Sequence, residues 1–169
     1  MTFIIQWQER GAGAEHYLAL PTPAGSLMLT LQGDVIVKTD WQIEFSGAGT
    51  TLCLEQHSLK TQFAKVWQNP SLPVEIKLLK QGSPFQNKVW HVLSQIPYGR
   101  TQTYSAIAKM LGSAARAVGG ACRNNPYPLL IPCHRVVAVS GMGGYSGRTE
   151  GELMDIKAKL LAHEAEHRK

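Results

Sequence analysis

The chain has 169 residues, of which 44% are hydrophobic and 17% are charged, a composition that fits a soluble globular protein and excludes a disordered or fibrous chain. It contains no apolar run of about eighteen residues, so we expect no membrane-spanning helix, and its first residues lack the basic and apolar regions of a secretory signal. The net charge of +5 combines −2 over residues 1–79 with +7 over residues 80–169, so the second half either favours a polyanion such as DNA, RNA or an anionic membrane surface, or presents a solvated basic face.

The first half of the chain is predicted to form a β-rich scaffold domain, residues 1–80. Short β-prone runs alternate with turn-forming residues, and Gly33-Asp34 between two of them fits a tight hairpin turn. Residues 58–67 carry apolar side chains at helical spacing. The predicted strands span residues 17–20, 26–32, 35–41 and 73–79. We find no catalytic constellation in this half.

The second half, residues 81–169, is predicted to be mostly helical. Ser83 begins a capping box in which Gln86 reaches back, with a proline at the first helical position. Thr103 and Ser113 are the expected caps of the next two helices, and Gly112 separates these helices. The predicted helices span residues 84–95, 104–111, 114–124 and 150–167. The second and third of them form a helix-turn-helix arrangement.

The third of these helices is unusually bare. Its only long side chains are Arg116 and Arg123, and Gly119 and Gly120 stand side by side in its interior. Glycine in a helix costs roughly 1 kcal/mol relative to alanine, so two in a row need a reason. One reason is tight packing against another helix. The other is close approach to nucleic acid, since a bare helix fits a minor groove about 6 Å wide.

The candidate for chemistry is Cys133, which is followed by His134 and Arg135. A thiol with an ordinary pKa near 8.5 is a poor nucleophile at pH 7, and a neighbouring imidazole or positive charge raises its thiolate fraction. An inert core cysteine is the alternative. A glycine-rich loop at 140–147 holds Tyr145 and Ser146; it lacks the context of a phosphate-binding loop and fits a wall over a small pocket.

The three cysteines do not suggest a disulfide framework or a metal site. Cys53, Cys122 and Cys133 are an odd number without a repeating spacing, which favours a reducing, cytoplasmic environment. A zinc site assembled from distant residues such as His16, Cys53 and His57 is disfavoured, because no closely spaced cluster of Cys and His is present. We therefore expect no metal and no cofactor.

Over residues 82–164 the chain resembles the O6-alkylguanine-DNA alkyltransferases, also called methylated-DNA–protein-cysteine methyltransferases. The resemblance rests on Gly-Ser-Pro-Phe-Gln, Ile-Pro-Tyr-Gly, Ala-Arg-Ala-Val-Gly-Gly-Ala, Arg-Asn-Asn-Pro, Ile-Pro-Cys-His-Arg-Val-Val, Gly-Gly-Tyr-Ser-Gly and Leu-Leu-Ala-His-Glu, in the family's order. The first half fits more loosely, with residues 22–27 similar to the family's opening hairpin. The resemblance implies an α+β fold: a small ribonuclease-H-like β-rich domain, then a mostly helical domain with a helix-turn-helix.

The resemblance also implies the function. A member of this family repairs double-stranded DNA by moving the alkyl group of O6-alkylguanine, and by expectation O4-alkylthymine, to its own cysteine, and is inactivated after one turnover. It binds the minor groove and flips the damaged base out of the duplex. We expect a protein that is monomeric in solution and cytoplasmic, with access to a bacterial-type nucleoid if prokaryotic, whether or not copies assemble cooperatively on DNA.

Roles of individual residues follow from the resemblance alone. Cys133 is the acceptor, His134 activates it through a water, and Glu164 on the last helix orients the imidazole. Tyr104 and Ser146 stabilise the leaving guanine. The remaining residues line the pocket (Val136, Tyr145 and Asn125, which stabilises the turn before the cysteine) or bind DNA (Arg116, which fills the vacated stack, Ala117, Gly119, Gly120 and Arg123, together with Tyr104).

Two departures and two rival functions follow from the same residues. Relatives that lack alkyl transfer carry tryptophan where this chain has Cys133, and Cys122 stands where many relatives have a larger apolar residue.

A module that only recognises alkylated bases would bind lesions without chemistry. A cysteine hydrolase of small substrates would turn over repeatedly and ignore DNA, and the basic half and the bare helix speak against it.

Overall fold

A computed structural model of the chain describes residues 2–42 and 54–167. Cys53 and the side chain of His57, two of the three candidate zinc ligands, lie outside the described residues. The chain divides into two compact units, Met1–Lys80 and Gln81–Lys169. Within the described ranges, no helix is long and apolar enough to cross a membrane.

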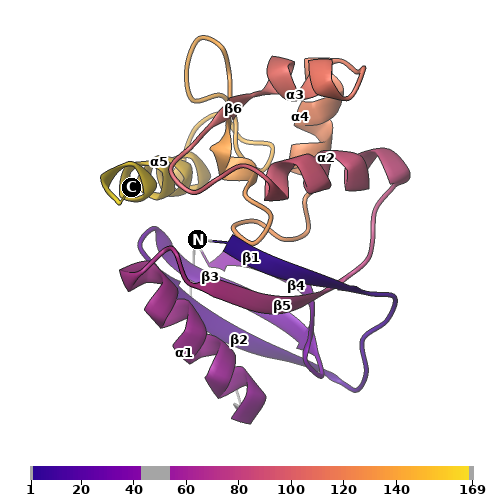
Figure 1. Cartoon of the computed structure of the whole chain (residues 1–169), viewed down its shortest axis with the longest axis vertical. Helices are drawn as coiled ribbons and strands as arrows, with labels where there is room; N and C mark the ends of the chain where they lie inside the picture. The colour runs from indigo at the N-terminus through magenta and orange to yellow at the C-terminus, as the bar shows by residue number, and fades with distance from the viewer. Residues whose placement is uncertain (1, 43–53, 168–169) are drawn as a thin grey trace. The chain divides into compact units, whose positions relative to one another are not determined.

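The first unit is a five-stranded sheet with one helix on it (Figure 1). The strands are β1 (Thr2–Gln8), β2 (Glu15–Thr22), β3 (Gly25–Gln32), β4 (Val35–Gln42) and β5 (Pro73–Leu79), in the order β1-β5-β4-β3-β2. β5 runs parallel to both β1 and β4, and the remaining pairs are antiparallel. The helix α1 (Leu54–Gln68) packs on one face, where the rings of Phe3 and Phe63 lie 5.5 Å apart.

Local sequence accounts for most of this sheet. Alternate residues of β3 such as Leu27 and Leu29 are fully buried, as the period of two requires. The predicted turn at Gly33-Asp34 is confirmed, and Gly33 adopts a φ of +63° that a tight hairpin needs. The strand β1 was not predicted, because its partner β5 lies far along the chain and no short-range turn announces the pairing.

The second unit is built from four α-helices and one short helical turn. The helices are α2 (Pro84–Ser94), α3 (Tyr104–Met110), α4 (Ala115–Arg123) and α5 (Glu152–Glu166), and η1 (Cys133–Arg135) is a 3-10 turn. Two-residue strands β6 (Gln102–Thr103) and β7 (Val136–Val137) pair in parallel and tie the segment after η1 to the start of α3. With the sheet of the first unit, this confirms the predicted α+β fold.

Helix caps set the boundaries of α2 and α3. The capping box at Ser83 is confirmed: Gln86 N donates to Ser83 Oγ at 3.3 Å and Ser83 N donates to Gln86 Oε1 at 2.7 Å. Thr103 caps α3 by accepting from Ala106 N at 3.1 Å. The indole of Trp90 on α2 is buried and donates to Ala121 O on α4 at 2.9 Å, which fixes these two helices against each other.

The predicted cap of α4 is wrong. Its cap residue is Ala114, which makes no side-chain cap hydrogen bond. Ser113 instead belongs to the end of α3: Gly112 adopts a φ of +59°, and Ser113 N donates to Ala108 O at 2.9 Å. This six-to-one bond is the Schellman ending of a helix, and it engages Ser113 one residue before Ala114, the cap residue of α4.

Candidate active site around Cys133

Cys133 begins η1 and is held from behind by Asn125. The thiol is 3% exposed. The Asn125 amide donates to Ile131 O at 2.8 Å and to Cys133 Sγ at 3.3 Å, and its oxygen accepts from Tyr127 N at 3.0 Å. Both donated hydrogen bonds of this amide and one accepted by its oxygen therefore fix the turn that carries the thiol.

The resting thiol is neutral. Burial raises the pKa of Cys133, against the hydrogen bond from Asn125 and the positive charge of Lys157, which lower it. A nucleophile with a raised pKa needs a base that takes its proton during the attack.

His134 and Glu164 form a buried pair directly behind the thiol segment. His134 Nε2 and Glu164 Oε1 are 2.9 Å apart. Burial by itself raises the pKa of the Glu164 carboxyl, but the hydrogen bonds from His134 and Arg135 and the positive charge of Arg135 outweigh it and hold that pKa at about 2. A carboxylate only accepts hydrogen bonds, so the shared hydrogen belongs to Nε2.

The other ring nitrogen of His134 is thereby assigned as the basic one. Burial lowers the pKa of His134, although its hydrogen bond to Glu164 raises it, so we assign the neutral imidazole. With the hydrogen on Nε2, Nδ1 carries the lone pair. Nδ1 is buried and has no hydrogen-bond partner among the residues that the structure describes. Its basicity is therefore available for proton transfer.

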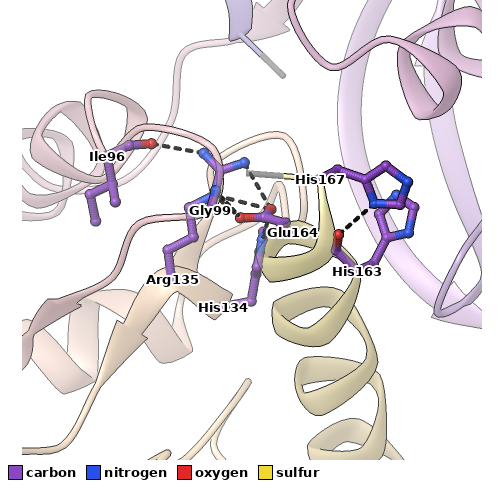
Figure 2. A network of polar contacts seen from close by, with 7 residues as sticks. All are labelled: Ile96, Gly99, His134, Arg135, His163, Glu164 and His167. Carbon is purple, nitrogen blue, oxygen red and sulfur yellow. Dashed lines mark hydrogen bonds and ion pairs between the residues drawn. The ribbon is translucent and has the colours of Figure 1, made fainter. Parts of the chain in front are cut away.

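Arg135 completes this network as the counter-ion of Glu164 (Figure 2). Its Nε and NH2 groups donate to the carboxylate at 2.9 to 3.1 Å, and NH1 donates to Ile96 O at 2.8 Å. Gly99 N also donates to Glu164 Oε2, at 2.9 Å. His163, the neighbour of Glu164 on α5, points away from the network in Figure 2.

A cavity of about 500 Å³ opens beside the thiol. Its lining comes from three places: the turn at Cys133, one face of α4 with the adjoining Tyr104, and the loop before α5. It is lined by Tyr104, Ala115, Arg116, Gly119, Gly120, Cys122, Arg123, Cys133, Gly144, Tyr145, Ser146, Gly147, Arg148 and Thr149. Arg116, Gly120, Arg123 and Arg148 are exposed, so the cavity reaches the surface of this unit.

The glycine-rich loop forms one wall of the cavity through a tight turn. Tyr145 N donates to Arg148 O at 2.8 Å and Arg148 N donates to Tyr145 O at 2.9 Å. Ser146 and Gly147 between them adopt φ of +48° and +80°, as a type I′ turn requires. Tyr145 is buried, and the hydroxyl of Tyr104 donates to Gly144 O at 3.1 Å. Burial raises the pKa of Tyr104, so its hydroxyl keeps its proton.

The two glycines of α4 face open space. A Cβ added to Gly119 or Gly120 would meet no atom within 4 Å. Tight packing inside the described part of the protein, one of the two reasons considered for these glycines, therefore does not explain them. Arg123 bends across the loop, and a Cβ on Gly147 would come within 2.8 Å of its Nε.

The predicted site residues fall into two groups, with Ala117 in neither. Eight line the cavity: Tyr104, Arg116, Gly119, Gly120, Arg123, Cys133, Tyr145 and Ser146. His134, Glu164, Asn125 and Val136 do not line it, and all four are buried. Ala117 is exposed on α4 outside the lining. Among the described residues, no three or more His, Cys, Asp or Glu side chains gather as a metal site.

Sequence reasoning missed Lys157. Its side chain is fully buried, and Nζ donates to Val136 O and Met142 O at 2.7 Å and to Gly144 O at 2.9 Å. Burial lowers the pKa of this ammonium to about 8. Lys157 thus ties the segment after the thiol to the cavity loop. A signal was present: Lys157 and Glu164 stand seven residues apart, on the same helical stripe as Leu160.

Comparison with known proteins identifies the family. A model of the "6-O-methylguanine DNA methyltransferase, DNA binding domain" matches residues 84–166. A constitutive methylated-DNA–protein-cysteine methyltransferase of Bacillus subtilis strain 168 is 36% identical over 162 residues, covering 86% of this chain and 93% of that protein.

Solved structures agree. The crystal structure of the Mycobacterium tuberculosis O6-methylguanine methyltransferase matches with a TM-score of 0.72 and 31% identity, covering 92% of this chain and 96% of that one. A second M. tuberculosis structure, described as OGT in complex with DNA, matches with a TM-score of 0.71 and 33% identity over 89% and 93% of the two chains. The resemblance found in the sequence is thereby confirmed, and the chain belongs to the O6-methylguanine-DNA methyltransferase family.

Proposed function

We propose that this protein repairs DNA by direct damage reversal, moving the alkyl group of O6-alkylguanine in duplex DNA to Cys133 in one irreversible turnover. The observation that carries the proposal is the shared cavity: the thiol at its base and the bare face of α4 at its mouth belong to one hollow. A hydrolase of small molecules has no use for an exposed, side-chain-free helix beside its nucleophile.

DNA binding is assigned to the exposed face of α4. Gly119 and Gly120 let a phosphate-sugar backbone or a groove floor approach the helix, and Arg116 and Arg123 supply positive charge at its two ends. The second half of the chain carries +7, which favours a polyanion. A relative of similar fold has been crystallised with DNA.

Base flipping follows from the position of the thiol. Cys133 is 3% exposed and lies on the lining of the cavity, whereas O6 of a stacked guanine lies at the major-groove edge of its base pair, on the side opposite the minor groove in which we expect α4 to bind. The damaged nucleotide therefore rotates out of the duplex, at a cost of a few kcal/mol. We assign Arg116, an exposed side chain on the cavity rim, to the space that the base vacates.

The transfer itself needs a base, an orienter and a donor for the leaving group. His134 Nδ1 takes the thiol proton through one water, and Glu164 keeps Nε2 protonated. Sulfur attacks the alkyl carbon, the S–C bond forms and the C–O6 bond breaks. Tyr104, whose hydroxyl stays protonated, turns its one hydrogen from Gly144 O to a ring nitrogen of the leaving guanine, and Gly144 O keeps its hydrogen bond from Lys157. Guanine regains a proton, and Cys133 ends as a thioether.

The substrate range extends to O4-alkylthymine in this proposal, because the same attack on a saturated carbon applies to it. Ser146 contributes a backbone amide near the base oxygen, and the carbonyl of Cys133 accepts a hydrogen bond from the exocyclic amine of guanine. Val136, by contrast, lies behind the lining with its carbonyl hydrogen-bonded to Lys157. Thymine lacks the exocyclic amine, so we expect slower transfer from O4-methylthymine than from O6-methylguanine.

Stoichiometry tests the proposal. Duplex DNA bearing labelled O6-methylguanine is added in increasing excess over the protein, and label on protein is counted. We expect saturation at one methyl per chain, with undamaged matched duplex giving none. Continued consumption of lesion beyond one per chain would contradict a single-turnover acceptor, and tight lesion binding without label on protein would favour the recognition module.

A further inference from the structure

Cys122 is a second thiol at the site, and alkyl transfer does not use it. It lies in the last turn of α4, is 6% exposed, and lines the same cavity as Cys133. Within the described ranges these two are the free cysteines. Buried cysteines are usually inert, so the question is whether this one lies where it can react with its neighbour.

Asn125 joins the two cysteines. Its backbone amide donates to Cys122 O at 3.3 Å, and its side chain donates to Cys133 Sγ at 3.3 Å. One residue thus contacts both the end of α4 and the acceptor sulfur. Electrostatic coupling agrees with this proximity: burial is the main cause of the raised pKa of Cys122, and the negative charge of a Cys133 thiolate adds to it.

The cavity also admits a small oxidant. Exposed residues form its mouth, and both cysteines are among the residues that line it. His134 is the base that removes the Cys133 proton for alkyl transfer. It can remove the same proton when the sulfur attacks a peroxide oxygen instead of an alkyl carbon. An oxidised Cys133 would then be met first by the other thiol of the same cavity.

We propose that Cys122 is a resolving cysteine: a hydroperoxide oxidises Cys133, and Cys122 closes a disulfide across the cavity that a thiol reductant reopens. In the first step the Cys133 thiol and the peroxide give a sulfenic acid, with water (or an alcohol) leaving. In the second, Cys122 sulfur attacks the sulfenic sulfur, and a second water leaves. Two thiols lose two electrons and the peroxide gains them. The disulfide blocks further, irreversible oxidation of the acceptor.

This inference relies on the proposed function only for its consequence, the sparing of the acceptor; the disulfide itself is tested separately. The full chain is treated with one equivalent of hydrogen peroxide, free thiols are blocked with N-ethylmaleimide, and the protein is digested with trypsin. Trypsin separates the two cysteines, because Cys122 falls in residues 117–123 and Cys133 in residues 124–135. We expect these two peptides joined, with a mass lower than their sum by about 2 Da because two hydrogens leave.

Two variants make the test specific. Cys53→Ser removes a thiol but keeps both cavity thiols, so the linked peptide should form as in the unmodified chain. Cys122→Ala removes the resolving thiol, so peroxide should drive Cys133 to sulfinic acid. After dithiothreitol treatment, methyl acceptance is expressed as a fraction of each protein's own untreated value. This recovered fraction should be about fivefold lower in Cys122→Ala than in the unmodified chain. Sulfinic acid at Cys133 in the unmodified chain, a disulfide involving Cys53, or equal recovery in Cys122→Ala would each overturn the proposal. Failure of alkyl transfer would leave the linked peptide unaffected.

Discussion

Gly120 separates the stability of α4 from its proposed contact with DNA, because alanine at this position should have opposite effects on the two. A Cβ there meets no atom within 4 Å, and Gly120 is not among the residues with positive φ, so alanine fits without strain. Glycine inside a helix costs about 0.5–1 kcal/mol relative to alanine. Gly120→Ala should therefore raise the free energy of unfolding by about that amount.

The same methyl group should weaken DNA binding. If a groove wall lies against the helix at Gly120, the added group must displace it, and overpacking of this kind costs about 1–3 kcal/mol, or roughly five- to hundred-fold in affinity. Urea denaturation measures the first effect, and titration of a fluorescent duplex bearing O6-methylguanine at fixed salt measures the second. Ala162→Gly, on an exposed position of α5 outside the cavity, is the matched control: it should lower stability and leave DNA affinity unchanged. Gly120→Ala with unchanged affinity would refute the assignment of this face to DNA.

Three further changes test other parts of the site. Arg116→Ala should impair repair of duplex DNA severalfold while an isolated O6-substituted guanine reacts at the normal rate; equal slowing of both substrates would place the arginine in the pocket instead. Glu164 has a pKa of about 2 when folded against an ordinary value of 4.5, so it stabilises the fold above pH 4.5 and loses that contribution as pH falls towards 2. At 1.36 kcal/mol per pKa unit the full contribution is about 3 kcal/mol, of which about 2 kcal/mol is lost between pH 7 and pH 3. This loss should be missing from the acid dependence of Glu164→Gln in denaturant melts at pH 3 to 7; identical acid profiles would contradict it. Lys157→Met should lower the free energy of unfolding by about 2–4 kcal/mol, because three carbonyls lose a buried donor, and a loss under 1 kcal/mol would show that Lys157 does not hold the loop.

Local patterns in the sequence were enough for the elements whose boundaries are set by neighbouring residues. The capping box at Ser83, the cap at Thr103 and the turn at Gly33 depend only on side chains a few positions away. The strand β1 was missed because its partner is about seventy residues distant. Ser113 misled for a related reason: two helix ends compete for one short segment, and the ending of α3 prevails.

The site divides in the same way. Cys133 and Tyr145 could be singled out from the sequence pattern, and the resemblance supplied the roles expected of them. The tautomer of His134 could not be read from the sequence, because it is set by the hydrogen bond to Glu164, thirty residues away. Glu164 in turn depends on Arg135 as its counter-ion. Lys157 escaped because a lysine on a mostly apolar stripe is usually an exposed neighbour rather than a buried donor. The emptiness around Gly120 is likewise a property of the surroundings.

Transfer to Cys133 is the central claim, and the mass of the protein after one reaction tests it most directly. Protein is incubated with a duplex carrying a single O6-methylguanine and analysed intact, and then as tryptic peptides. The claim predicts a gain of one methyl group, located on Cys133 in the peptide 124–135, and no gain in Cys133→Ala. Unmodified Cys133 with the lesion still bound, or a methyl group on another residue, would contradict it.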